Sequence, residues 1–184
     1  MYSICNTGKP LHAAIVFRKE DGTHAILEAG QNGVLKVFIT DLDTRLHSFD
    51  GTILVRRLRK PLATEQDRQL REFALAQEGK PYALGRLLLQ GTPLRARGPV
   101  RTYCLGKTCL DRDRWVCSEL VVAGMTAAGV LNARDFPANT FYPRDLCYDE
   151  GRHDLGRYYE APALWYPRSE LEYIGSTIKM QPPR

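Results

Sequence analysis

The chain has 184 residues, of which 26 are Lys or Arg and 21 are Asp or Glu, giving a formal net charge of +5. This length supports one domain with its own hydrophobic core, and no shift in composition divides residues 1–184 into two domains. The basic excess is too mild for a nucleic-acid-binding protein, so we expect no nucleic-acid partner.

The sequence carries no sign of a membrane span or of a cleavable leader. No apolar run approaches the ~20 residues that cross a bilayer, and residues 1–5 lack the basic and apolar regions of a signal peptide. The five cysteines are odd in number and irregularly spaced, which does not fit a disulfide framework. We therefore expect no transmembrane segment and a location in the cytoplasm, or export without a cleavable signal peptide.

Short apolar runs in the first third of the chain predict β-strands. Residues 12–17 and 24–29 flank an Asp-Gly dipeptide at 21–22, which is typical of a hairpin turn. Residues 34–39 and 52–58 are further runs, the second rich in β-branched side chains. The first third should therefore be mostly sheet.

A helix is predicted next. Residues 64–67 resemble a helix capping box. The residues that then share one helical face are Leu70, Phe73, Ala74 and Gln77. Gly79 is suited to end this helix. Residues 80–114 show no sustained period and are rich in Gly, Pro and Arg, which predicts an irregular basic excursion with one helical turn near Leu87.

A second helix is predicted from Trp115 onward. The residues that recur there at three- and four-residue steps are Cys117, Leu120, Val121, Gly124, Met125 and Ala128. This pattern places Cys117 in the first turn, and Gly129 ends the helix. Residues 139–146 are then rich in turns, and residues 163–166 and 171–177 are candidates for closing strands.

Cys117 occupies a position suited to a nucleophile. Unpaired backbone N–H groups and the dipole at a helix N-terminus favour negative charge, and a cysteine attacks as its thiolate. A histidine within hydrogen-bond reach can take the thiol proton, and a third polar residue can fix the histidine tautomer. His12 and Glu28 are the candidates for these roles. The alternative for Cys117 is a buried thiol that only packs.

The third residue depends on the length of the hairpin loop. A two-residue loop at 21–22 pairs position 12 with position 31, which places Gln31 beside His12 and turns Glu28 away. A loop that differs by an odd number of residues, or a bulge, puts His24 and Glu28 on the His12 face instead. Both arrangements stay open from the sequence.

Taken together, these segments resemble the permuted papain-like amidases, the YiiX/YebB-like branch of the NlpC-type cysteine peptidases. Residues 12–16 resemble the histidine strand of that family, residues 26–29 its next strand, and residues 115–121, Trp-Val-Cys-Ser-Glu-Leu-Val, its nucleophile helix. Residues 79–82 and 142–146 are two shorter matching elements. Specificity rests mainly on Cys-Ser-Glu-Leu-Val in this histidine-before-cysteine order.

The resemblance implies an α+β fold in which an antiparallel sheet packs against the nucleophile helix, circularly permuted relative to papain. It implies a catalytic triad of Cys117, His12 and Glu28 without a cofactor or a metal. The expected activity is that of a cysteine amidase or peptidase, a thiol hydrolase. The expected substrate is a small peptide or acyl-amide, such as a peptidoglycan fragment or an N-acyl amino acid. The place of the basic excursion between residues 79–82 and Cys117, rather than the resemblance, makes its arginines candidates to bind substrate. With Tyr82, the expected substrate-binding residues are Arg95, Arg97 and Arg101.

Other functions remain open from the sequence. Lipid acyl transfer or thioester hydrolysis is one, because the spacing of His12 and His24 resembles the paired histidines of lecithin–retinol acyltransferase-like proteins; their nucleophile motif, Asn-Cys-Glu-His, differs from Val-Cys-Ser-Glu here. A non-catalytic interaction domain is another. A metal-binding module is the third, and it lacks any Cys-x-x-Cys pair. Its ligands would come from Cys104, Cys109, Cys117, Cys147 and His153.

Overall fold

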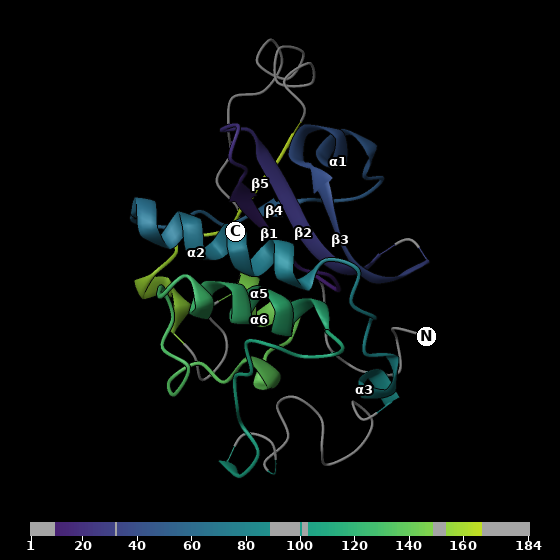
Figure 1. The fold of residues 1–184 in the computed structure, drawn as a ribbon, viewed down its shortest axis with the longest axis vertical. Helices are drawn as coiled ribbons and strands as arrows, with labels where there is room; N and C mark the ends of the chain where they lie inside the picture. The colour runs from purple at the N-terminus through teal and green to yellow at the C-terminus, as the bar shows by residue number, and fades with distance from the viewer. Residues whose placement is uncertain (1–9, 32, 89–99, 101–102, 149–153, 167–184) are drawn as a thin grey trace, which may run out of the picture.

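The structure, a computed structural model, describes residues 10–31, 33–88, 100, 103–148 and 154–166. Small antiparallel sheets pack against helices in a mixed α/β arrangement (Figure 1). This confirms the predicted combination of antiparallel sheet and helices.

The main sheet has three strands in the order β1-β2-β3. Strand β1 covers Ala14–Arg18, β2 covers His24–Gln31 and β3 covers Val34–Asp41, and both neighbouring pairs are antiparallel. These strands match the predicted apolar runs. Alternation along β2 buries Leu27 and Ala29 on the face that carries the core.

The connection between β1 and β2 is longer than a two-residue turn. Arg18 pairs with His24, and the Lys19 backbone N–H donates to the Thr23 carbonyl at 2.8 Å. The two-residue alternative, which pairs position 12 with position 31, is therefore wrong. In the observed register Ala14 lies opposite Glu28. This is the alternative register, which puts His24 and Glu28 on the same face as His12.

A bulge interrupts the β2–β3 pairing near the end of β2. The register shifts between Ala29 and Gln31, and Gly30 between them has φ 72°. A Cβ at Gly30 would lie 2.3 Å from the Tyr82 ring, so this ring packs directly on the Gly30 backbone. Only glycine fits both the backbone conformation and the close approach.

The chain after the first long helix extends the sheet beyond β3. Pro81 bridges to Lys36 of β3, and Tyr82 bridges to Trp115 in the parallel sense. The Tyr82 N–H donates to the Leu35 carbonyl at 2.8 Å. The sheet is thereby connected to the backbone that leads into the nucleophile helix predicted from the sequence.

Two helices form the layer that covers the core face of the sheet (Figure 1). Helix α2 covers Thr64–Gln77, and α5 covers Cys117–Ala127. The predicted face of α2 is buried, although its capping box starts one residue earlier, where Gln66 Oε1 accepts from the Ala63 N–H at 3.1 Å. Gly79 and Gly129, with φ of 82° and 67°, follow the two helices as predicted.

Shorter elements complete the fold. Helix α1 (Leu42–Ser48) packs on β2 and β3, and α3 (Leu84–Leu88) is the turn predicted in the basic excursion. Helix α6 (Pro143–Cys147) contacts α5. Among the described residues, η3 (Ala138–Thr140) and η4 (Leu155–Arg157) are 3₁₀ turns.

The predicted strand at residues 52–58 is short. Only β4 (Leu54–Val55) forms, paired antiparallel with β5 (Ala163–Leu164) from the far end of the chain. The strand predicted within residues 163–166 is thus present. The one predicted at residues 171–177 lies outside the described residues.

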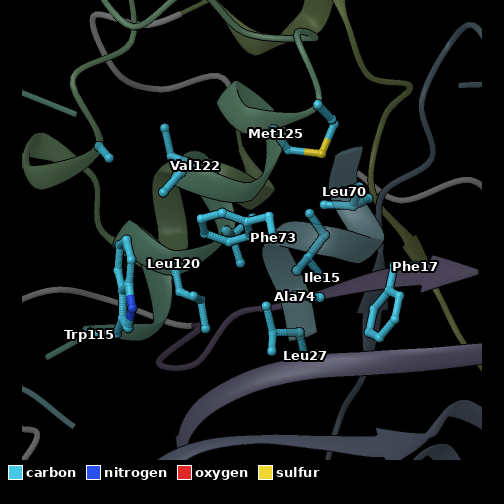
Figure 2. Close-up of a cluster of buried hydrophobic side chains, with 14 of the residues drawn as sticks. Ile15, Phe17, Leu27, Leu70, Phe73, Ala74, Trp115, Leu120, Val122 and Met125 are labelled. Carbon is cyan, nitrogen blue, oxygen red and sulfur yellow. The ribbon is translucent and has the colours of Figure 1, made fainter. Parts of the chain in front are cut away.

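The hydrophobic core lies between the main sheet and the two long helices. Figure 2 shows Phe73 of α2 in its centre, near Leu120 and Val122 of α5. The Phe73 and Trp115 rings meet edge to face with centroids 6.0 Å apart. A Cβ at Gly124 would lie 3.3 Å from Phe73, so the absence of a side chain there lets α5 approach α2 closely.

Among the described helices, the structure contains no segment with the length and apolar character of a membrane span.

Candidate active site

Cys117 begins helix α5 and is 4 % exposed. Its N-cap residue, Val116, makes no side-chain capping bond to the first turn. Trp115, which precedes Val116, is held by two backbone hydrogen bonds. Its N–H donates to the Pro81 carbonyl at 3.1 Å, and its carbonyl accepts from the Ala83 N–H at 2.8 Å. The thiol therefore lies at an uncapped helix N-terminus, where backbone N–H groups favour negative charge.

The rest of the Cys-Ser-Glu-Leu motif holds α5 in place. Ser118 Oγ donates to the Phe141 carbonyl at 2.7 Å, which connects the helix to the segment before α6. Glu119 is 3 % exposed and forms an ion pair with Arg86 of α3. Leu120 is fully buried in the core. Each of the three residues after Cys117 thus anchors a different side of the helix.

His12 lies just before β1 and interacts with both other members of the predicted triad. Its Nε2 is 3.0 Å from Glu28 Oε2. Burial of the ring lowers the pKa of His12, but hydrogen bonding and charge attraction from Cys117 and Glu28 outweigh burial and raise this pKa to about 9. The imidazole therefore keeps its proton at neutral pH.

Glu28 is buried, at 1 % exposure, on the opposite face of β2 from Leu27 and Ala29. Its carboxylate also accepts from Arg45 of α1, with Nε at 2.5 Å from Oε1 and Nη2 at 3.1 Å from Oε2. Burial raises the pKa of Glu28, while bonds from His12 and Arg45 lower it, and the net direction is downward. The carboxylate is therefore ionised and has two cationic partners.

The hairpin register explains why Glu28 meets His12. Ala14 lies opposite Glu28, and a side chain two positions before Ala14 shares its face. His24 lies on the same face but is exposed, and it pairs with Arg18 at the far end of β1. Arg18 is six residues from His12, so His24 lies roughly 20 Å from His12 along the strands at ~3.3 Å per residue. His24 is therefore wrong as the orienting residue, and the histidine pair that motivated the acyltransferase alternative does not form.

The structure places the other predicted site residues as follows. The Tyr82 ring is half-buried on the Gly30 backbone, in the segment that pairs with Trp115. Arg95, Arg97 and Arg101 lie outside the described residues, as does the Gln31 side chain.

No three His, Cys, Asp or Glu side chains gather into a possible metal site within the described part of the chain. Cys104 is exposed there, and Cys147 is the buried last residue of α6. His153 lies outside that part.

Sequence reasoning missed Arg45. The signal was present, because Asp41 Oδ1 accepts from the Thr44 N–H at 3.1 Å, and Asp followed three residues later by Thr is a capping pattern for α1. Recognising that helix would have placed a basic residue next to the strand that carries Glu28.

No protein-family model, no curated protein and no solved structure matches this chain.

Proposed function

We propose that this protein is a cysteine hydrolase that cleaves an amide bond with Cys117 as nucleophile, His12 as proton carrier and Glu28 as the residue that orients His12. One observation carries the proposal. A buried thiol at an uncapped helix N-terminus interacts with an imidazole whose Nε2 is held by a buried carboxylate. This combination of nucleophile, base and orienting group is the arrangement that thiol hydrolysis requires.

The protonation of His12 defines the first step. Because Glu28 holds Nε2, Nδ1 is the ring nitrogen left for Cys117. A thiolate attacks the amide carbonyl carbon, the C–N bond breaks, and the His12 imidazolium gives its proton to the leaving amine. First-turn N–H groups of α5 are suited to stabilise the oxyanion that forms on the carbonyl oxygen.

The second step releases the acid. After the amine leaves, neutral His12 accepts a proton from water, whose oxygen attacks the thioester carbon. The C–S bond then breaks, the carboxylic acid departs and the thiolate–imidazolium pair is restored. Glu28 stays ionised throughout, since Arg45 and His12 both stabilise its charge.

The arrangement of elements also supports the resemblance to permuted papain-like amidases. The histidine precedes one strand of an antiparallel sheet, the orienting acid lies on the next strand, and the cysteine starts a helix packed on that sheet. The chain order is histidine, acid, cysteine, which is the order of that family. We propose the permuted papain-like fold on this basis.

The substrate we propose is an amide in a small peptide, a peptidoglycan fragment or an N-acyl amino acid. The test is digestion of purified peptidoglycan and of a panel of N-acyl amino acids, with mass spectrometry of the products. The intact chain should release a new amine and a new carboxylate, and Cys117→Ala should release neither. Equal products from Cys117→Ala would refute the assignment of the nucleophile.

Selective alkylation is a test that needs no substrate. Iodoacetamide at pH 6 to 7 should label Cys117 faster than the other cysteines, and His12→Ala should remove this difference. Labelling of Cys117 at the rate of the exposed Cys104 would indicate a packing thiol or a non-catalytic domain instead.

A further inference from the structure

A cavity of about 360 Å³ lies between α3, the loop around residues 104–112 and the first turn of α5. Three basic side chains line it, those of Arg86, Lys107 and Arg112. Its volume falls in the range of small-molecule sites, and a cavity with convergent charged groups is a candidate binding site. The triad described above does not line it.

Arg112 is the most unusual group in this cavity. Its Nε and Nη2 atoms are buried, and neither has a hydrogen-bond partner among the residues that the structure describes. A buried guanidinium donor left unpaired costs more than a typical hydrogen bond returns, so such donors normally have partners. The fork of guanidinium N–H groups matches the two oxygens of a carboxylate or phosphate.

The charges around the cavity favour an anion. Arg86 is compensated by its ion pair with the buried Glu119. In the part of the chain that the structure describes, neither Lys107 nor Arg112 forms an ion pair. Two cationic charges therefore face the same space without a counterion among the described side chains, which raises the local concentration of anions.

The wall of the cavity is preorganised by side-chain bonds to the backbone. Asn139 is 8 % exposed, accepts from the Lys107 N–H at 2.8 Å and donates to the Leu105 carbonyl at 2.8 Å. Thr108 Oγ1 accepts from the Ala138 N–H at 2.9 Å and donates to the Phe136 carbonyl at 3.0 Å. The loop that carries Lys107 is thus held in one conformation before any ligand binds, which lowers the entropic cost of binding.

The cavity lies close to the proposed nucleophile. Glu119 follows Cys117 by two residues, a rotation of about 200° around the axis of α5. The cavity and the Cys117 thiol therefore lie on opposite sides of the first turn of α5. The distance between them is about one helix diameter, ~10 Å. An extended peptide covers this distance in about three residues.

We propose that this cavity binds an oxyanion group, a carboxylate or a phosphate, with Arg112 as its main ligand and Lys107 as a second cation. Resting on the function proposed above, the anion belongs to the amide substrate and lies two or three residues from the bond that is cleaved. The substrate class is then an acidic or phosphorylated acyl-peptide.

Direct binding tests the cavity without requiring hydrolysis. The protein would be the full chain with Cys117→Ala, and the probes inorganic phosphate, glutarate and the neutral glutaramide, at low salt. Saturable binding of phosphate or glutarate should shift the Arg112 Nε–Hε NMR resonance, and glutaramide should not bind. Preference between phosphate and glutarate distinguishes the two sources of the oxyanion. Absence of saturable binding by both anions would overturn the proposal.

Arginine variants test the assignment of the ligand. Arg112→Gln should weaken anion binding about tenfold or more, corresponding to the loss of at least one charge-assisted hydrogen bond. Arg114→Gln is the matched control, because Arg114 is exposed in the same loop and does not line the cavity. Because Arg112 has unpaired donors, Arg112→Gln should fold, and an unchanged thermal unfolding midpoint checks this. Equal loss of binding in both variants would indicate nonspecific attraction and refute the site.

Kinetics then separates this proposal from the proposed function. With an acyl-peptide that carries a carboxylate three residues from the amide, Arg112→Gln should raise KM and leave kcat nearly unchanged, because a remote anion binds equally in ground and transition states. Anion binding without amide hydrolysis would support the anion site and refute the hydrolase function. Amide hydrolysis without anion binding would support the hydrolase function and refute the anion site.

Discussion

Glu28 is held between two cations in a buried position, and this arrangement defines the chemistry of the candidate site at the residue scale. Arg45 reaches the carboxylate from α1 and His12 reaches it from the chain before β1. A buried carboxylate with one cation removed must lose charge or find another donor. Arg45 therefore acts on His12 only through Glu28, as a positioning residue.

We predict that Arg45→Met destabilises the protein by about 3 kcal/mol or more, because it leaves the buried Glu28 carboxylate without its bidentate partner. Arg68→Met is the matched control. Its ion pairs with Glu65 and Glu72 are exposed on both sides, so their loss should cost far less. Urea unfolding of both variants measures the difference. Equal stability losses would show that the Glu28–Arg45 pair has no special role.

The pKa of His12 predicts how stability depends on pH. The folded-state pKa of about 9 lies above the unfolded value of 6.5, so the folded chain holds this proton more tightly. The stabilisation is complete below pH 6.5 and is lost as pH rises through 9. The free energy of unfolding should therefore fall across this window in the intact chain and fall less in His12→Gln. Parallel curves from urea titrations at pH 6, 7.5 and 9.5 would contradict this prediction.

The sequence carries enough information to propose three of these residues but not their environment. Cys117 and His12 stand out by residue type and local context, and Glu28 because an acid on an apolar strand needs a partner. Arg45 does not stand out among the Lys and Arg residues, since its partner is set by how α1 packs on the sheet. Likewise, the burial of the unpaired Arg112 N–H groups results from tertiary contacts, which the sequence does not reveal.

At the scale of elements, the bulge in β2 connects the sheet to α5, the helix that begins with Cys117. Gly30 permits the bulge and receives the Tyr82 ring, and Tyr82 in turn pairs with Trp115 immediately before α5. A chain of direct contacts thus runs from the strand of Glu28 to the start of the helix of Cys117.

We predict that Gly30→Ala costs about 1–3 kcal/mol more than Gly22→Ala, because its Cβ meets the Tyr82 ring. Gly22 is the control. It has φ 84° but nothing within 4 Å of an added Cβ, so its substitution carries only the backbone strain of about 1–2 kcal/mol. Thermal unfolding of the single variants and of Gly30→Ala/Tyr82→Ala measures the effect. If Tyr82→Ala does not reduce the cost of Gly30→Ala, the clash is not its cause.

The predicted elements succeeded where the periodicity of one segment carried the signal, and failed where a turn hydrogen bond or a remote partner decided the structure. Strands β1 to β3 and helices α2 and α5 follow from periodicity within each segment. The loop length between β1 and β2 did not, because Asp21 Oδ1 accepts from the Thr23 N–H at 2.9 Å and supports a wider turn than Asp-Gly suggests. Residues 52–58 form only a two-residue strand, since the partner strand lies at Ala163–Leu164.

At the scale of the whole molecule, one core stabilises the elements that carry or adjoin the three residues of the proposed triad. It includes residues of β1, β2, α2 and α5 (Figure 2). Perturbing this core should therefore affect stability and the candidate site together.

We predict that Phe73→Ala lowers the free energy of unfolding by about 3–5 kcal/mol, because it opens a cavity beneath α5. Leu75→Ala is the control in the same helix. Leu75 is 57 % exposed, so its loss should change stability by about 0.5 kcal/mol or less. Chemical denaturation measures both. A small effect of Phe73→Ala would mean that the two helices repack without it.

His12 and Cys117 are separated by about 100 residues of chain, and closing a loop of that size is entropically costly before native contacts form. The contacts that α5 makes with β1 and β2 join residues far apart in the sequence. Such a topology is associated with slower folding than that of helical bundles. If Cys117 is the nucleophile proposed above, its thiol gains its reactivity only after the sheet and α5 have assembled. Alkylation of Cys117 during refolding would then report the time at which the hairpin and the helix dock, and a nascent chain would stay unreactive at this position until the ribosome had passed the helix.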